Sequence, residues 1–328
     1  MPAALTIDDD ALATYIDSNA DAATQKNYLD DIKEELSVLI GAAERLTNMV
    51  RLESIRIPKD FAAVAAELRP NAKHPLAAGN EPLILPIAGK TGWIFLVHAK
   101  LFGPEFDAHI RHTLYWHELT RLTHKMQFPT LRRGQKPNRN SILLGELYRA
   151  FGEYDAARKA FAWRDGLLKE HLHEQLSKLA REDFVSSLHG QAQIALADQH
   201  EAYPASLNFV LKESGDVRGF LSAMRPFITH RTVALSLAWA AMDHDPALSL
   251  EAARKLSALP QEARPLLGLF RKHHVSGNAD LTEDIDILGN LWKVWGLHIV
   301  DTSSGITVEP QIPQDESQDS PEKDQVNV

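Results

Sequence analysis

The feature that most constrains this chain is a regular apolar seam that runs through residues 24–54. Its members recur at alternating spacings of three and four residues, the pattern of a helix that packs one face along an apolar partner. Charged side chains such as Asp30, Lys33 and Arg45 fall outside the seam. The pattern therefore predicts one continuous helix over residues 24–54, with an interface made by Leu29, Ile32, Leu36, Leu39, Leu46 and Val50.

Two kinds of partner would cover this seam. A later helix of the same chain would bury it inside the fold, which is the commoner arrangement within one globular chain. A second copy of the chain, or another protein, would bury it in an intermolecular interface. The sequence leaves both arrangements open.

A second ordered pattern lies in residues 140–168. Leu144 and Tyr148 are one helical turn apart, and Gly145 would let a second helix approach closely. Gly152 would permit a sharp turn before a second apolar face. The set resembles one tetratricopeptide repeat, which implies a helical hairpin over residues 141–165 that turns at Gly152. The residues that carry the resemblance are Leu144, Gly145, Tyr148, Gly152, Tyr154, Ala157 and Phe161. No second copy follows at about 34 residues, so a stacked array is not expected.

Strand signals are confined to short stretches. Two apolar runs, residues 83–87 and 93–100, flank a Gly-containing turn and predict a β-hairpin. Near the C-terminus, predicted helices over residues 261–273 and 281–296 precede a second predicted hairpin. This order resembles a winged-helix module, in which the helix before the hairpin lies in the major groove of DNA. The predicted helix carries Glu283, Asp284 and Asp286, which suits DNA poorly and a protein contact better.

The predicted fold is mainly α: an irregular multi-helix protein with a long N-terminal heptad helix, one small β-hairpin and a C-terminal winged-helix-like module. The expected divisions follow composition and pattern. They are an N-terminal segment (1–23), a region with the heptad helix, the β-hairpin and a His-rich helix (24–128), a helical domain with the repeat-like hairpin (129–260), the winged-helix-like module (261–308) and a disordered acidic tail (309–328).

Composition excludes several classes of protein. The 328 residues include no cysteine, so disulfides and Cys-ligated zinc are excluded. No apolar run approaches the roughly 18 residues of a membrane span, and the N-terminus is acidic where a signal peptide is basic. The net charge of −9 argues against a nucleic-acid coat. The sequence thus predicts a cytoplasmic protein that binds no membrane and no cofactor.

The predicted helix at residues 109–125 is rich in histidine and arginine. In metalloproteases, two histidines at i and i+4 on one helix bind zinc, and the glutamate at i+1 is the general base. Here His117 and Glu118 are followed by Arg121 where the second ligand would stand. His124 lies two turns from His117, about 10 Å along the axis. No metal site is therefore predicted.

The same helix offers a nucleolytic alternative. Arg111, His112 and His117 resemble the Arg-polar-x(3–5)-His motif of the HEPN ribonuclease superfamily, whose helical bundles usually pair two motifs across a dimer. The resemblance implies that Arg111 would bind the scissile phosphate and that His117 would act in acid–base transfer, without a metal. Residues 164–171 fit the same pattern, so the motif has low specificity.

A basic loop follows this helix at residues 131–140. Its candidate nucleic-acid contacts are Arg132, Arg133, Lys136 and Arg139. A flexible basic loop between helices suits phosphate binding, although it holds no aromatic side chains for base stacking. A solvated connector in an acidic protein is the equally weighted alternative.

The sequence favours a non-enzymatic helical adaptor or assembly subunit that binds a protein partner or self-associates through the N-terminal helix. The alternative is a protein associated with RNA or DNA through the basic loop, including a HEPN-like, metal-independent ribonuclease.

Overall fold

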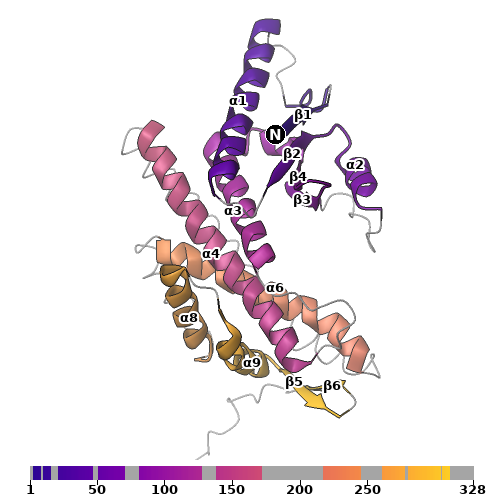
Figure 1. The fold of residues 1–328 in the computed structure, drawn as a ribbon, viewed down its shortest axis with the longest axis vertical. Helices are drawn as coiled ribbons and strands as arrows, with labels where there is room; N and C mark the ends of the chain where they lie inside the picture. Colours follow the sequence, from indigo (N-terminus) through magenta and orange to yellow (C-terminus); the bar gives the residue numbers. More distant parts are fainter. Residues whose placement is uncertain are drawn as a thin grey trace, which may run out of the picture. The chain divides into compact units, whose positions relative to one another are not determined.

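The structure, a computed structural model, describes residues 3–8, 10–15, 21–46, 51–70, 81–127, 138–171, 217–244, 261–277, 280–303 and 305–310. It is mainly helical, as predicted, with a mixed sheet and a small hairpin (Figure 1). The chain divides into two compact units that are discontinuous in sequence. Unit 1 comprises residues 1–129, 151–191 and 236–252, and unit 2 comprises residues 130–150, 192–235 and 253–328.

A four-stranded mixed sheet organises unit 1. Its strands are β1 (Ala4–Ile7), β2 (Leu52–Ile57), β3 (Ile84–Ala88) and β4 (Trp93–Val97), in the order β1-β2-β4-β3. β2 pairs in parallel with β1 and β4, whereas β3 and β4 form an antiparallel hairpin. The hairpin predicted from residues 83–100 is confirmed. The strands β1 and β2 were not predicted.

Helix α1 (Ala22–Leu46) begins after Asp21, whose side chain accepts a hydrogen bond from the Thr24 amide at 2.7 Å. The prediction of one helix through residue 54 is wrong at its C-terminal end, because residues 52–57 form β2. β-branched Ile55 and Ile57 fit a pleated strand between β1 and β4, and both are fully buried there. Pairing with two neighbouring strands therefore sets the conformation of residues 52–54, which the sequence had assigned to the helix.

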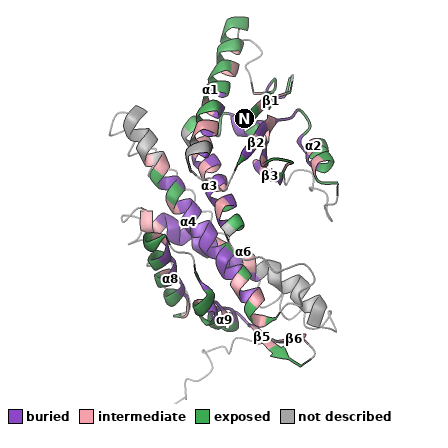
Figure 2. Ribbon diagram, in the orientation of Figure 1, coloured by how far each residue is buried: buried purple, intermediate pink, exposed green. Residues whose placement is uncertain are grey.

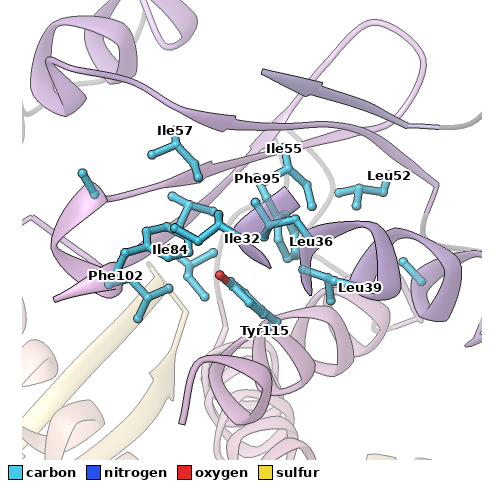
Figure 3. Packing of buried hydrophobic residues seen from close by; sticks show 14 of the residues in the cluster. Ile32, Leu36, Leu39, Leu52, Ile55, Ile57, Ile84, Phe95, Phe102 and Tyr115 are labelled. Carbon is cyan, nitrogen blue, oxygen red and sulfur yellow. The ribbon is translucent and has the colours of Figure 1, made fainter. Parts of the chain in front are cut away.

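The apolar seam of α1 packs inside its own unit. Ile32, Leu36 and Leu39 are at most 3% exposed and lie in one core with residues of the sheet and with Tyr115 (Figure 3). The prediction that these three form an intermolecular interface is therefore wrong, and the intramolecular alternative holds. Leu29 packs half-buried against the same core. The side chain of Leu46, and Val50 as a whole, lie outside the described residues.

Two further helical segments follow β2 in the chain, one before β3 and one after β4. Helix α2 (Phe61–Leu68) begins after Asp60, which caps it by accepting from the Ala63 amide at 2.9 Å. Phe61 packs in a smaller core with Ile87 and Ile94 on the hairpin. A short 3-10 helix, η1 (Ala99–Phe102), then precedes α3 (Ala108–Gln127), which contacts both α1 and β3.

Helix α4 (Arg139–His171) is continuous, so the predicted hairpin turn at Gly152 is wrong. Among the described residues, glycines with positive φ are Gly277, Gly296 and Gly305, and Gly152 keeps helical geometry. The apolar residues on either side of it, Phe151 and Tyr154 among them, are buried by neighbouring elements. Figure 2 shows a buried stretch along α4. A helix that buries most of its surface here has no need of a reversal to form a core.

Unit 2 contains the N-terminal part of α4 and most of α6 (Val217–His244), together with α8 (Ala263–Ser276), η3 (Thr282–Asp284) and α9 (Ile285–Val294). The antiparallel strands β5 (Leu297–Thr302) and β6 (Gly305–Pro310) follow and confirm the second predicted hairpin. Trp292 is fully buried, and its indole Nε1 donates to Thr232 Oγ1 at 3.2 Å. The acidic tail predicted to be disordered lies mostly outside the described residues.

Candidate functional site

Helix α3 carries the charged residues that the sequence singled out. It begins after Asp107, whose carboxylate accepts a hydrogen bond from the Ile110 amide at 2.8 Å. Tyr115, Leu119 and Leu122 recur at helical spacing and are buried in the core of unit 1, which fixes the orientation of the helix. The histidine and arginine side chains therefore fall on the remaining faces.

Arg111 is committed to an ion pair with α1. Its Nε lies 2.9 Å from Glu35 Oε1, its Nη2 contacts the other carboxylate oxygen, and its Nη1 donates to the Phe106 carbonyl. The two side chains are only 12% and 9% exposed, and the guanidinium also lies over the Phe102 ring. Burial alone would lower the pKa of Arg111, but Glu35 outweighs burial and raises it. This pairing is bidentate and holds α3 to α1.

His117 lies in a different group, made with Arg121 and two glutamates. Its Nε2 is 3.3 Å from Glu153 Oε2 on α4, and its Nδ1 is 3.8 Å from Glu118 Oε1. Arg121 bridges the same carboxylates: Nη1 lies 3.3 Å from Glu153 Oε1 and Nη2 lies 3.1 Å from Glu118 Oε2. We call these four residues, His117, Glu118, Arg121 and Glu153, the α3–α4 charge cluster.

The charge cluster is internally neutral when His117 is protonated. Burial by itself would lower the pKa of His117, but the carboxylates of Glu118 and Glu153 outweigh burial and raise it to about 9. Burial acts to raise the pKa of Glu153, and His117 together with Arg121 lowers it below its usual value. Near neutral pH, two cations therefore face two anions. An imidazole held in this state cannot accept a proton as a general base.

Two other contacts join α3 to α4 beside the cluster. His124 Nε2 lies 2.5 Å from Asp155 Oδ2, and Lys159 lies 2.7 Å from the same oxygen. Half-buried Trp116 stacks on Trp163, with ring centroids 4.3 Å apart and planes inclined by 8°. These contacts and the charge cluster fix how α4 lies against α3 within unit 1.

The residues proposed for catalysis, Arg111 and His117, do not meet in this chain. They lie six positions apart on α3 and bind carboxylates from α1 and α4, respectively. Of the four basic-loop residues, only Arg139 lies within the described residues. It occupies the first position of α4, and its guanidinium lies 2.7 Å from Asp286 on α9. Arg132, Arg133 and Lys136 lie outside them.

The partners that close these groups, Glu35, Glu153 and Asp155, were not singled out from the sequence. Glu35 is one of the charged residues that fall outside the α1 seam. Glu153 and Asp155 lay within the segment assigned to the second arm of a hairpin. One signal was available: two acidic residues in an otherwise apolar helical stretch require buried partners.

Comparison with known proteins identifies no relative of this chain. No family model matches the chain, and neither the curated proteins nor the solved structures yield a match. Within the part of the chain that the structure describes, no helix is long and apolar enough to cross a membrane. Within the same residues, no three His, Asp or Glu side chains are grouped so that they could hold a metal ion.

Proposed function

We propose that this chain is a non-enzymatic helical adaptor or assembly subunit that acts through protein contacts. One observation carries the proposal: the acid–base side chains of α3 are already paired within unit 1. Arg111 is bound by Glu35, and His117 is held protonated between Glu118 and Glu153. A catalytic base or a phosphate-binding arginine has to be available to its substrate, and these pairings oppose both roles.

The C-terminal elements of unit 2 suggest where a partner would bind. The order α8, α9, β5 and β6 is that of the winged-helix-like module expected from the sequence. In a DNA-binding module of this kind, the helix before the hairpin carries basic side chains. Here Glu283 and Asp284 lie in η3 just before α9, and Asp286 lies in the first turn of α9. The side chain of Asp286 is 78% exposed although it pairs with Arg139. Acidic side chains at this end of the helix favour a protein partner with a complementary basic surface.

The nucleic-acid alternative draws less support from the described residues. Arg139 already forms an ion pair with Asp286. Phosphate binding by the basic loop would therefore depend on Arg132, Arg133 and Lys136, which lie outside the described residues. The ribonuclease form of this alternative requires Arg111 to leave Glu35 before it could bind a phosphate. We therefore treat nucleic-acid binding as an outcome of the test below.

A capture experiment with two matched variants distinguishes these functions. Tagged full-length chain is recovered from native lysate at high salt, with and without nuclease. The basic-loop variant replaces Arg132, Arg133, Lys136 and Arg139 by Ser, and the acidic-helix variant replaces Glu283 and Asp286 by Lys.

As an adaptor, the native chain retains a defined protein after nuclease treatment. That protein remains with the basic-loop variant and is lost with the acidic-helix variant. Recovery of nucleic acid alone, removed by nuclease and by the basic-loop substitutions, would contradict the adaptor function.

A further inference from the structure

The charge cluster has the layout of a metal site with one ligand replaced. His117 and Arg121 stand at i and i+4 on α3, with Glu118 between them, which is the spacing that places two zinc-binding histidines on one helical face. The third ligand of many such sites is a glutamate from elsewhere in the chain, and His₂Glu sets are typical of zinc enzymes. Glu153 on α4 supplies a glutamate against both positions.

The distances support this comparison. Two ligands that each lie about 2.1 Å from a tetrahedral zinc ion are about 3.4 Å from each other. His117 Nε2 and Glu153 Oε2 are 3.3 Å apart, and Nε2 has no aligned hydrogen-bond partner. These two atoms therefore already stand at the separation that shared coordination of zinc requires.

The charges of the cluster also resemble those of a divalent-metal site. Glu118 and Glu153 are only 15% and 10% exposed, and two largely buried carboxylates require compensating positive charge. In this chain the guanidinium of Arg121 contacts both carboxylates and supplies positive charge to them. A divalent cation bound by neutral histidines would balance the same two carboxylates.

We propose that the α3–α4 charge cluster is a divalent-metal site in layout, in which the guanidinium of Arg121 takes the place of the metal ion. In the native chain, Arg121 fills the site and joins α3 to α4 without a metal. Replacement of this one side chain by a ligand opens the site to Zn²⁺, with His117, residue 121 and Glu153 as the protein ligands. A water molecule completes the tetrahedron.

The test compares the full-length native chain with Arg121→His and Arg121→Cys. Each protein is stripped with a chelator and titrated with Zn²⁺, and with Co²⁺ as a coloured substitute. Both variants are expected to bind one equivalent of metal, to show the visible absorption of tetrahedral Co²⁺, and to melt at a higher temperature when loaded. The native chain takes up no metal at this site. Because the chain has no cysteine, a Co²⁺–thiolate band can arise only from position 121.

Three controls locate the ion. Arg121→Ala removes the guanidinium without adding a ligand and should bind no stoichiometric zinc. Adding Glu153→Gln to Arg121→His should abolish binding, because a ligand is lost. Adding Glu118→Gln to Arg121→His should retain binding, because Glu118 lies outside the ligand set.

The result is decisive even if a variant does not fold without metal. If the layout is as proposed, zinc restores its helical circular dichroism and its cooperative melting. The proposal is overturned if both variants fold and bind no metal, or if zinc fails to restore unfolded ones. Equal zinc affinity with and without Glu153→Gln would also overturn it.

Discussion

At the scale of single residues, Arg111 and His117 show how partners decide what a side chain can do. Both were predicted as catalytic only under the ribonuclease alternative, which rested on their spacing along one helix. Each has a carboxylate partner that is distant in sequence: Glu35 for Arg111 and Glu153 for His117. A spacing motif specifies the helix face on which a side chain lies, but it carries no information about the helix opposite. The catalytic assignment stays a prediction, and the pairings make a stabilising role testable.

The Arg111–Glu35 pair gives the first stability prediction. Arg111→Met leaves the Glu35 carboxylate almost buried without its partner, which should lower the free energy of unfolding by about 3–5 kcal/mol. Adding Glu35→Leu removes the unpaired charge and should restore most of that loss. Urea unfolding of Arg111→Met, Glu35→Leu and the double variant measures both effects. An Arg111→Met chain as stable as the native chain would show that the pair is not formed in solution.

At the scale of elements, the presence of helices was predicted more accurately than the residues at which they end. Strands were predicted less accurately than helices. The β3–β4 hairpin has its strands adjacent in sequence, with a turn between them, and was found. The residues of β2 pair with residues of β1 that are about 50 positions away and with residues of β4 that are about 40 positions away, so its strand pairing is not local. The α1 seam runs to Val50, two residues before β2 begins, and the predicted helix was extended through residue 54 into the strand. Burial by distant strands decides the boundary.

The continuity of α4 also removes the role that a helical hairpin would give Gly145. A repeat-like hairpin needs a small residue there so that a second helix can approach. In the structure, Gly145 is exposed, and an added Cβ would meet no atom within 4 Å. The candidate site could likewise be predicted only in part. The residues that α3 contributes were recognised from the sequence, whereas the partner residues on α4 depend on how the two helices pack, which residue spacing does not specify.

Gly145→Ala is therefore expected to stabilise unit 2 by about 0.5–1 kcal/mol, because alanine has the higher helix propensity and restricts the unfolded chain. Gly289→Ala in α9 is the matched control in the same unit. Its Cβ would lie 2.7 Å from Arg139 Nη2 and 3.1 Å from Leu143 Cδ1, so it should give no such gain. Thermal unfolding of the two variants measures the difference. A loss of stability in Gly145→Ala would instead favour a close helix contact at this position.

At the scale of the whole molecule, the chain comprises two compact units, each with its own buried side chains. In unit 1 the core lies between α1, the sheet and α3, and ion pairs extend the packing from α3 to α1 and α4. In unit 2 buried Trp292 and Trp295 lie near the C-terminal hairpin, with Arg231 over the Trp295 ring at 4.6 Å. We therefore expect the charged side chains of α3 to stabilise unit 1. The proposed function is a contact between the surface of the protein and a partner.

The pH dependence of stability tests this central claim most directly. The pKa of His117 is raised from 6.5 to about 9 by Glu118 and Glu153, with Arg121 as the remaining charged member of the cluster. The folded chain therefore keeps a proton that the unfolded chain has lost between these two pH values. The stabilisation is complete below pH 6.5 and disappears as the pH rises through 9. The pKa difference corresponds to about 3 kcal/mol.

The measurement is the free energy of unfolding of unit 1 in the native chain and in His117→Gln, from pH 6 to pH 9.5. We expect the native chain to be the more stable at pH 6 and its advantage to shrink by about 3 kcal/mol by pH 9.5, since only the native chain loses the His117 proton. An advantage that does not change with pH, or that grows as the pH rises, would contradict an internally neutralised charge cluster and reopen His117 as a free acid–base group.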